Sequence, residues 1–212
     1  LYQRSIYQSI RGTVRKCLSW VKGHKDGFPL SIQNLMTEVS KSEDEILEKL
    51  KSILYSKIET VQIRIHGDYH LGQVLYNGKD YVIIDFEGEP AKPVTERRLK
   101  RSALRDIAGM LRSFHYAVYY TLYKSNAFRA EDIPFLEPWG EVWYEFVKCY
   151  FMRGYAQQCA GTKLIPVNEE HLSLLLNAFL LDKVCYEINY ELNYRPDWAI
   201  IPLKGLQYLI KK

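Results

Sequence analysis

The chain has 212 residues, of which 47% are hydrophobic, and its formal net charge is +4. This length and apolar content fit one substantial core, or at most two small ones, and exclude a disordered chain. Basic and acidic residues are interspersed except in the run Arg97–Arg101, which argues against a nucleic-acid-binding protein, and no apolar run is long enough to span a membrane.

Residues 1–60 are predicted to be a helical lead-in. Within Tyr2–Val21, apolar residues recur at every fourth position, which predicts an amphipathic helix. Gly27–Pro29 then breaks the chain, and Ser42 followed by three acidic residues is typical of a helix start. An apolar stripe continues this second helix to about Tyr55. The apolar residues of the first helix are Ile6, Ile10, Val14 and Leu18.

Residues 61–90 are predicted to hold three short strands. Val61–Ile65 alternates in polarity and leads into a loop. Val74–Tyr76 and Tyr81–Asp85 flank an Asn-Gly turn signal, which predicts a tight hairpin. Because the second hairpin strand is so apolar, we expect it to be buried, with the Asp85 carboxylate emerging at its end.

Residues 91–212 are predicted to form a helical subdomain. Pro134–Pro138 is expected to interrupt the helices, and Arg195–Asp197, which contains a proline, is expected to end the last one. The expected helices are Ser102–Leu122, Glu141–Gln158 and Glu169–Leu192. The whole chain is therefore expected to be mainly α with a small β-hairpin element (α+β).

The cysteines indicate the cellular compartment, and the first residues indicate whether the sequence belongs to a longer polypeptide. Four scattered cysteines without a C-x-x-C pair argue against a zinc ribbon by their spacing and are typical of a reducing, cytoplasmic environment. The sequence opens LYQRSIYQSIRG, without an initiator Met or a signal-peptide pattern. We interpret this opening at Leu1 as a segment of a longer polypeptide.

The stretch His66–Gln73, HGDYHLGQ, and the later VIIDFEGEP carry the chemistry. Protein kinases use H-R-D-x-x-x-x-N followed by D-F-G in the same order. By this pattern Asp68 is the catalytic base that orients an acceptor hydroxyl. Gln73 and Asp85 would hold Mg²⁺ against the phosphates of ATP, since hard oxygen ligands suit this ion. Each residue alone would be an ordinary loop or strand-end residue, and their order favours the kinase interpretation.

Three further residues are expected to support this loop. H-x-D-x-H could be a metal site, but we favour His66 and His70 as packing and hydrogen-bonding residues beneath the loop. Asp106 could accept hydrogen bonds from the loop backbone, or could simply complement its own helix dipole. Glu87 and Glu89 could crowd the metal or pair with the basic run, and for Glu89 we favour the pairing.

The sequence contains no G-x-G-x-x-G loop with a phosphate-binding lysine, which a complete kinase carries in its smaller lobe. Residues 1–60 also predict helices and not a sheet. The chain is therefore expected to be the larger C-lobe of a protein-kinase-like fold without its N-lobe. The isolated chain is expected to be inactive.

Three segments resemble the maltokinase family of the aminoglycoside-phosphotransferase and protein-kinase-like superfamily. They are RIHGDYHLGQVLYNGKDYVIIDFEGEP, ERRLKRSALRDIAGMLRSFHYA and KVCYEINYELNYRPDWAIIPLKGL. The resemblance implies ATP-dependent phosphorylation of maltose to maltose 1-phosphate for α-glucan (glycogen) synthesis. It also implies partners: an upstream N-lobe and, as in trehalose synthase–maltokinase fusion proteins, a trehalose synthase domain.

The last of these segments also suits a sugar site on physical grounds. Tyr186 and Tyr190 lie four residues apart and share a helix face, and sugar rings stack on aromatic side chains. Glu191, Arg195 and Trp198 would add polar and aromatic contacts. The alternative is ordinary core aromatics with surface acids, and the resemblance favours the sugar site.

Two rival functions stay open at this stage. A non-catalytic maltose-binding or docking module of a trehalose or α-glucan enzyme would explain the missing nucleotide lobe. A small-molecule kinase for another acceptor, such as an aminoglycoside or a choline-like cation, would need an acidic acceptor pocket.

Overall fold

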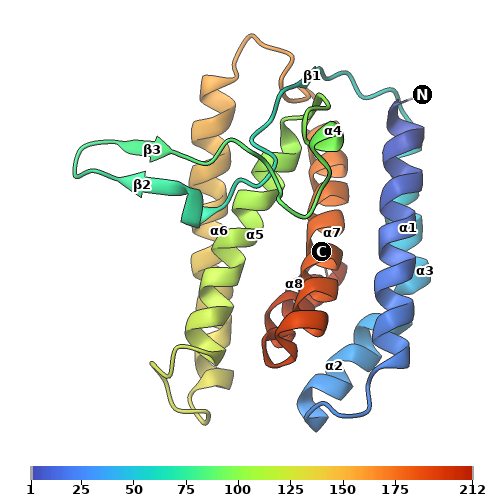
Figure 1. Cartoon of the computed structure of the whole chain (residues 1–212), viewed down its shortest axis with the longest axis vertical. Coiled ribbons are helices and arrows are strands. Elements are labelled where there is room, and N and C mark those ends of the chain that lie inside the picture. Colours follow the sequence, from blue (N-terminus) through green and yellow to red (C-terminus); the bar gives the residue numbers. More distant parts are fainter. Residues whose placement is uncertain (1, 212) are drawn as a thin grey trace.

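The computed structural model describes residues 2–211, which form an array of helices with two small antiparallel sheets (Figure 1). The predicted class, mainly α with a small β element, is confirmed. The helices are α1 (Tyr2–Gly23), α2 (Leu30–Lys41), α3 (Glu43–Lys51), α4 (Val94–Arg97), α5 (Leu104–Tyr123), α6 (Ile133–Gln158), α7 (Glu169–Tyr194) and α8 (Ile200–Lys211). The strands are β1 (Gln62–Ile63), β2 (Val74–Tyr76), β3 (Tyr81–Ile83) and β4 (Arg101–Ser102). Among residues 2–211, no helix is both long enough and apolar enough to cross a membrane.

The core runs through the long helices. The four apolar positions predicted for α1 are all buried, and α1 packs against α7, which in turn packs against α5. Because these residues recur every fourth position, they form one stripe that can be buried against a neighbouring helix. One continuous cluster of buried side chains joins α1, α2, α5, α7 and α8.

Two twelve-residue helices, α2 and α8, and the four-residue helix α4 were missed by the sequence analysis. The Gly27–Pro29 signal that predicted a break also precedes α2, since Pro29 stands at the residue before the first helical turn. A proline is tolerated there because the first amide groups of a helix have no intrahelical partner. The second missed helix, α8, follows Arg195 and packs against α7 and α2.

The prediction that prolines interrupt the chain before Glu141 is wrong, because α6 begins at Ile133 and runs through both Pro134 and Pro138. Pro134 lies in the first turn, where its missing amide hydrogen has no consequence. Pro138 costs one backbone hydrogen bond near the start of a 26-residue helix, and the remaining bonds continue the helix.

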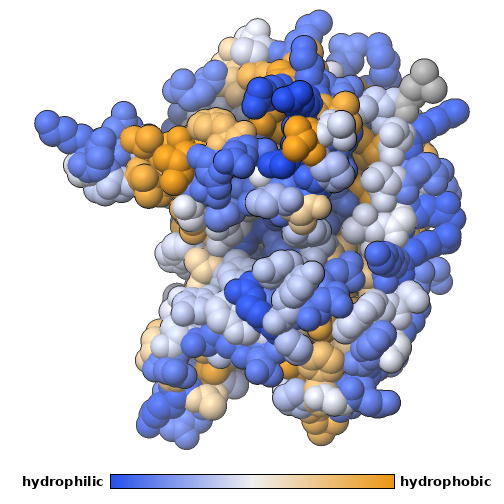
Figure 2. Space-filling view, viewed as in Figure 1, coloured by the Kyte–Doolittle hydropathy of each residue, from blue (hydrophilic) through white to orange (hydrophobic). Residues whose placement is uncertain are grey.

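The predicted hairpin is present, with Val74 opposite Ile83 and Tyr76 opposite Tyr81. The Asn77 side chain accepts hydrogen bonds from two turn amides, and Gly78 has a φ of +92°, which an L-residue adopts only with strain. The prediction that its second strand is buried is wrong, since Val82 is 46% exposed. The hairpin projects from the helices as a two-stranded ribbon, and its apolar side chains are visible on the surface (Figures 1 and 2).

Candidate active site

The loop that follows β1 is fixed to the start of α5. The Asp106 carboxylate accepts hydrogen bonds from the backbone amides of His66 (2.7 Å) and Gly67 (2.9 Å). Farther along, the Ser113 hydroxyl accepts a bond from the amide of Leu71 at 3.0 Å. Burial raises the pKa of Asp106, and the two amide bonds oppose this shift by stabilising the carboxylate. The predicted contact between Asp106 and the loop backbone is therefore present.

His66 links this loop to the strand that leads to Asp85. Its ring is buried, Nε2 donates to the carbonyl oxygen of Ile84 at 2.7 Å, and Nδ1 accepts from the amide of Asp68 at 3.3 Å. Both ring nitrogens are thus used within the protein, which fits a neutral imidazole and leaves neither as a metal ligand. Among residues 2–211, no group of three or more His, Cys, Asp or Glu side chains is placed to hold a metal ion.

His70 lies on the other side of Asp68. Its Nδ1 accepts a hydrogen bond from the amide of Gly72 at 3.0 Å, which caps the short 3-10 turn before β2. Its Nε2 lies 3.7 Å from Oδ2 of Asp68. The ring therefore shapes the loop and flanks the carboxylate.

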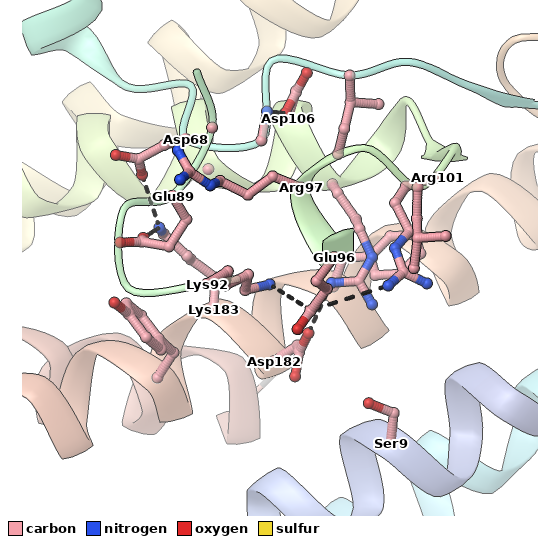
Figure 3. Close-up of a pocket in the computed structure, with 18 of the residues that line it drawn as sticks. Ser9, Asp68, Glu89, Lys92, Glu96, Arg97, Arg101, Asp106, Asp182 and Lys183 are labelled. Atoms are coloured by element: carbon pink, nitrogen blue, oxygen red, sulfur yellow. Dashed lines mark hydrogen bonds and ion pairs between the residues drawn. The ribbon is translucent and has the colours of Figure 1, made fainter. Parts of the chain in front are cut away.

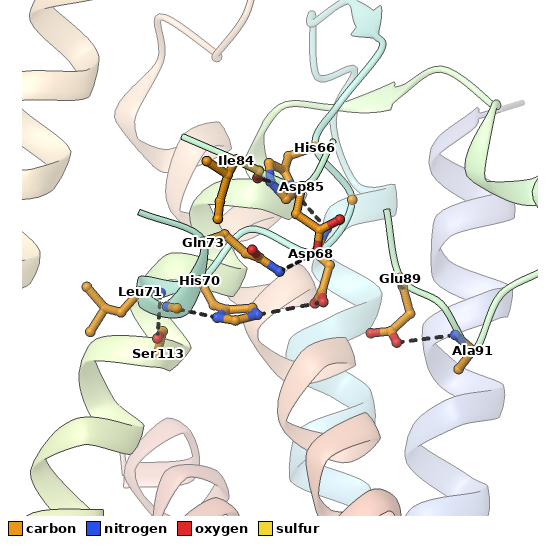
Figure 4. Close-up of polar contacts among 12 residues, drawn as sticks. His66, Asp68, His70, Leu71, Gln73, Ile84, Asp85, Glu89, Ala91 and Ser113 are labelled. Atoms are coloured by element: carbon orange, nitrogen blue, oxygen red, sulfur yellow. Dashed lines mark hydrogen bonds and ion pairs between the residues drawn. The ribbon is translucent and has the colours of Figure 1, made fainter. Parts of the chain in front are cut away.

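The hairpin brings Gln73 and Asp85 together. Gln73 Nε2 donates to Asp85 Oδ2 at 2.8 Å, and the backbone pairing extends past the strands, since the Ile84 amide donates to the Gln73 carbonyl. Figure 4 shows Asp68 beside this pair, with the three polar groups facing one another. Asp85 has a φ of +63°, in the left-handed region that few residues other than glycine adopt. Strained backbone of this kind is concentrated at functional sites.

These groups have the chemistry of a magnesium site. The bond between Gln73 and Asp85 leaves Oε1 of Gln73 and Oδ1 of Asp85 for another partner. Mg²⁺ is usually held by one or two carboxylate or amide oxygens together with substrate phosphates and water. The donor set fits the ion, and Gln73 and Asp85 would hold it.

Lys183 on α7 was missed by the sequence analysis. Its ammonium lies 3.4 Å from Oδ1 of Asp68, 4.0 Å from Oε2 of Glu89 and over the ring of Tyr186. The prediction that Glu89 pairs with the basic run is therefore wrong; Arg97 instead contacts Glu87, through its carbonyl at 3.2 Å. The spacing of Lys183 three residues before Tyr186 puts both on one face of α7, and this was the available signal.

A cavity of about 500 Å³ opens beside Asp68. It lies between α1, α7 and the loop that precedes α5 (Figure 3). Glu89, Lys183 and Tyr186 line it near Asp68, and Ser9 of α1 lies on the far side. Burial, followed by the neighbouring Glu89, raises the pKa of the Tyr186 hydroxyl, so this group stays protonated and can donate a hydrogen bond.

The structure divides the five predicted sugar-binding residues. Tyr186 lines the cavity and stacks on Tyr190 at 6.5 Å between ring centroids, whereas the other four, at the end of α7 and just beyond it, do not line the cavity. The Arg195 guanidinium lies over the rings of Tyr190 (5.4 Å) and Trp198 (4.6 Å). Glu191 is buried, and its oxygens are used by Arg195 (2.7 and 2.9 Å) and by the Tyr116 hydroxyl (3.0 Å). Glu191 is therefore a partner of Arg195 and is not open to a ligand.

The comparisons with known proteins relate the chain to sugar kinases. It is 24% identical over 151 residues to a glucosamine kinase of Streptacidiphilus jiangxiensis and 30% identical over 147 residues to one of Mycolicibacterium smegmatis. These matches cover 71% and 68% of the chain but only 32% and 34% of the relatives. No family profile matches the chain.

Solved structures agree on the fold. A glucosamine kinase structure (crystal form B) aligns with 98% of the chain and 46% of its own length, at a TM-score of 0.76 and 19% identity. A glucosamine kinase in complex with glucosamine, ADP and inorganic phosphate aligns at a TM-score of 0.73 and 17% identity, over 99% of the chain and 47% of that protein. The similarities together suggest a sugar kinase family. The relatives named here are glucosamine kinases, and the narrower resemblance to maltokinases is not shown by them.

Proposed function

We propose that this chain is the catalytic lobe of an ATP-dependent sugar kinase. The observation that carries the proposal is that Asp68, which lines a cavity of about 500 Å³, lies beside the hydrogen-bonded pair of Gln73 and Asp85. Ligand cavities of this kind measure about 300–1,000 Å³. Residues 1–60 support the cavity, 61–90 supply the catalytic loop and metal-binding hairpin, and 91–212 complete the lobe. An N-lobe elsewhere in the polypeptide would complete the nucleotide cleft.

The residues divide the work of phosphoryl transfer. Asp68 accepts the hydrogen of the acceptor hydroxyl and aims its oxygen at the γ-phosphate; positioning counts for more than basicity because the transition state is largely dissociative. Lys183, beside Asp68, balances the carboxylate charge. Mg²⁺ bound by Gln73 and Asp85 would neutralise charge on the transferred phosphoryl group. His66, His70 and Asp106 hold the loop in place.

For the acceptor we propose a neutral sugar, with maltose phosphorylated at its C1 hydroxyl. A cationic amino sugar needs an unpaired carboxylate, but the acids that line the cavity have partners within the chain. Asp182 pairs with Arg105, Glu96 with Lys92, and Glu89 with Lys183. Asp68 also faces Lys183, and Asp106 is used by two backbone amides.

The second candidate acceptor is glucosamine, which the names of the relatives favour. Initial rates with Mg²⁺ and ATP, measured on the whole polypeptide against maltose, glucose and glucosamine, separate the two. Preference for maltose supports the neutral-sugar proposal, and preference for glucosamine contradicts it while leaving the kinase assignment intact.

Asp68→Asn tests the kinase assignment itself. The substitution keeps the shape of the side chain but removes its ability to accept a proton, and we expect turnover to fall by about 10²–10⁴-fold. Asp26→Asn, at an exposed turn, is the matched control and should retain wild-type turnover. Near-normal rates for Asp68→Asn would remove the base assignment.

The chain spans about a third of the relatives' length, which also supports a non-catalytic binding module as a rival. Calorimetry on the 212-residue chain with maltose and with ATP–Mg²⁺ addresses this. Sugar binding by the chain together with sugar phosphorylation by the whole polypeptide supports the proposed lobe. Sugar binding without any phosphorylation by the whole polypeptide supports the module.

A further inference from the structure

Helix α6 carries a stripe of large apolar side chains that the other residues in the range 2–211 do not cover. The stripe consists of Phe135, Trp139, Val142, Trp143, Phe146 and Tyr150, whose exposed fractions range from 46% to 73%. Their spacing of three and four residues places all six on one face of the helix. The opposite face packs against α5 and contains Tyr144, which is buried. Figure 1 shows α6 at the edge of the helical array.

The stripe is too large for an ordinary monomer surface. Taking about 150–250 Å² for each aromatic residue, its exposed area is about 700 Å². The largest apolar patch on a typical monomer is about 300–600 Å², and larger patches mark contact sites. If two copies bury the same stripe, the total is about 1,400 Å², which falls within the range of about 1,200–2,000 Å² that stable interfaces bury.

The pattern along the stripe fits a second copy of the same helix. Positions 135, 139, 142 and 146 are separated by steps of four, three and four, which is the repeat of a two-helix seam. An antiparallel pair centred between Val142 and Trp143 brings Phe135 opposite Tyr150 and Trp139 opposite Phe146. The stripe is thus complementary to itself under a two-fold axis.

The charges beside the stripe favour this orientation. Glu131 and Asp132, just before α6, both pair with Arg129, which leaves one net negative charge there, and Arg153, near the end of α6, is exposed. In an antiparallel pair Arg153 of each copy lies near the acidic start of the other, whereas a parallel pair would bring like charges together.

We propose that two copies of this protein associate through the α6 stripe in an antiparallel, symmetric dimer. Sedimentation velocity on the whole polypeptide tests the association, comparing wild type with the double variant Trp139→Glu/Phe146→Glu. We expect a dimer for the wild type and at least about a 100-fold weaker association for the variant, since both residues lie at the centre of the contact. A wild-type monomer, or a variant that dimerises unchanged, would overturn the proposal.

The control is Leu30→Glu/Val167→Glu, which places the same charges at two exposed apolar residues outside the stripe (71% and 94% exposed) and should leave the dimer intact. Far-UV circular dichroism checks that both variants are folded. The same dimer loss in the control would show that added charge, and not the stripe, is responsible, and this would also contradict the proposal.

A second measurement needs no substitution. Cys149 is the exposed cysteine and the other three in the chain are buried, so a spin label attaches beside the stripe. In the antiparallel pair the two labelled positions lie 13 residues apart along the axis, which is about 20 Å at 1.5 Å per residue. Electron–electron dipolar spectroscopy should give a separation of about 20–30 Å, allowing for the interhelical distance. No dipolar coupling, or a separation near 10 Å as in a parallel pair, would contradict the arrangement.

Discussion

His66 and Asp106 show how single residues shape the site. Asp106 fixes the loop from the α5 side through two amide bonds, and His66 fixes it from the hairpin side through Ile84. Asp68 lies between these two anchors, so the loop sets the position of its backbone, while its carboxylate faces Lys183 and His70. The spacing of the motif predicted Asp68 as the catalytic base and offered a contact between Asp106 and the loop. It did not predict which group the His66 ring would bond.

Another histidine, His115, is buried in the core, and neither ring nitrogen has a hydrogen-bond partner within residues 2–211. It stacks on Tyr119 and touches the edges of Tyr144 and Tyr208. Burial, followed by the nearby Arg112, lowers the pKa of this histidine well below its usual value. The folded protein therefore holds it as the neutral imidazole.

This burial predicts a loss of stability in acid. Below a pH of about 6.5 the unfolded chain takes up a proton on His115 that the folded chain does not, so the free energy of unfolding falls as the pH falls. The contribution of His115 to this slope is at most about 1.4 kcal/mol per pH unit. We expect His115→Phe to reduce the slope between pH 6.5 and 5, measured by urea unfolding at each pH.

His24→Phe is the control, because His24 lies exposed beside Trp20. The slope measured for His115→Phe is compared with the slope of this variant, which removes an exposed histidine. An unchanged slope in His115→Phe would show that His115 is not the group that titrates.

At the scale of elements, the close approach of α5 to the loop depends on a glycine. A Cβ atom at Gly109 would lie 2.7 Å from the carbonyl oxygen of Tyr69, which is backbone and cannot turn aside. The loop that carries Asp68 can therefore rest on α5 only where α5 has no side chain. Asp106 and Ser113 bind the same loop from either side of this contact.

Gly109→Ala should push the loop away from α5. We expect a loss of about 1–3 kcal/mol in the free energy of unfolding, as for other overpacked sites, together with reduced turnover in the whole polypeptide. In Gly154→Ala on α6, the new methyl group meets nothing within 4 Å, and alanine should stabilise that helix by about 0.5–1 kcal/mol. Thermal unfolding and steady-state kinetics on both variants measure these changes. Wild-type stability and turnover in Gly109→Ala would contradict the tight contact between α5 and the loop.

The molecule as a whole has one core, which includes residues of the lead-in helices and of the last helix. We therefore expect residues 2–211 to unfold in a single cooperative transition, with equal calorimetric and van't Hoff enthalpies. Ile10→Ala, in the buried stripe of α1, should lower the midpoint of that same transition through a loss of about 2–5 kcal/mol. Two separate transitions, or an effect confined to one of them, would show that α1 folds apart from the rest.

Local spacing in the sequence determined the α1 stripe, the Asn-Gly hairpin and the order Asp68, Gln73, Asp85, because each depends on residues that are near neighbours in the chain. Only the tertiary structure decided that Lys183, 115 residues from Asp68, is its charged partner, and that Glu89 faces Lys183 and not the basic run. It also decided that the apolar β3 strand is exposed and that the aromatic stripe of α6 is left uncovered. Periodicity shows which residues share a face, whereas the packing of distant elements determines what that face meets.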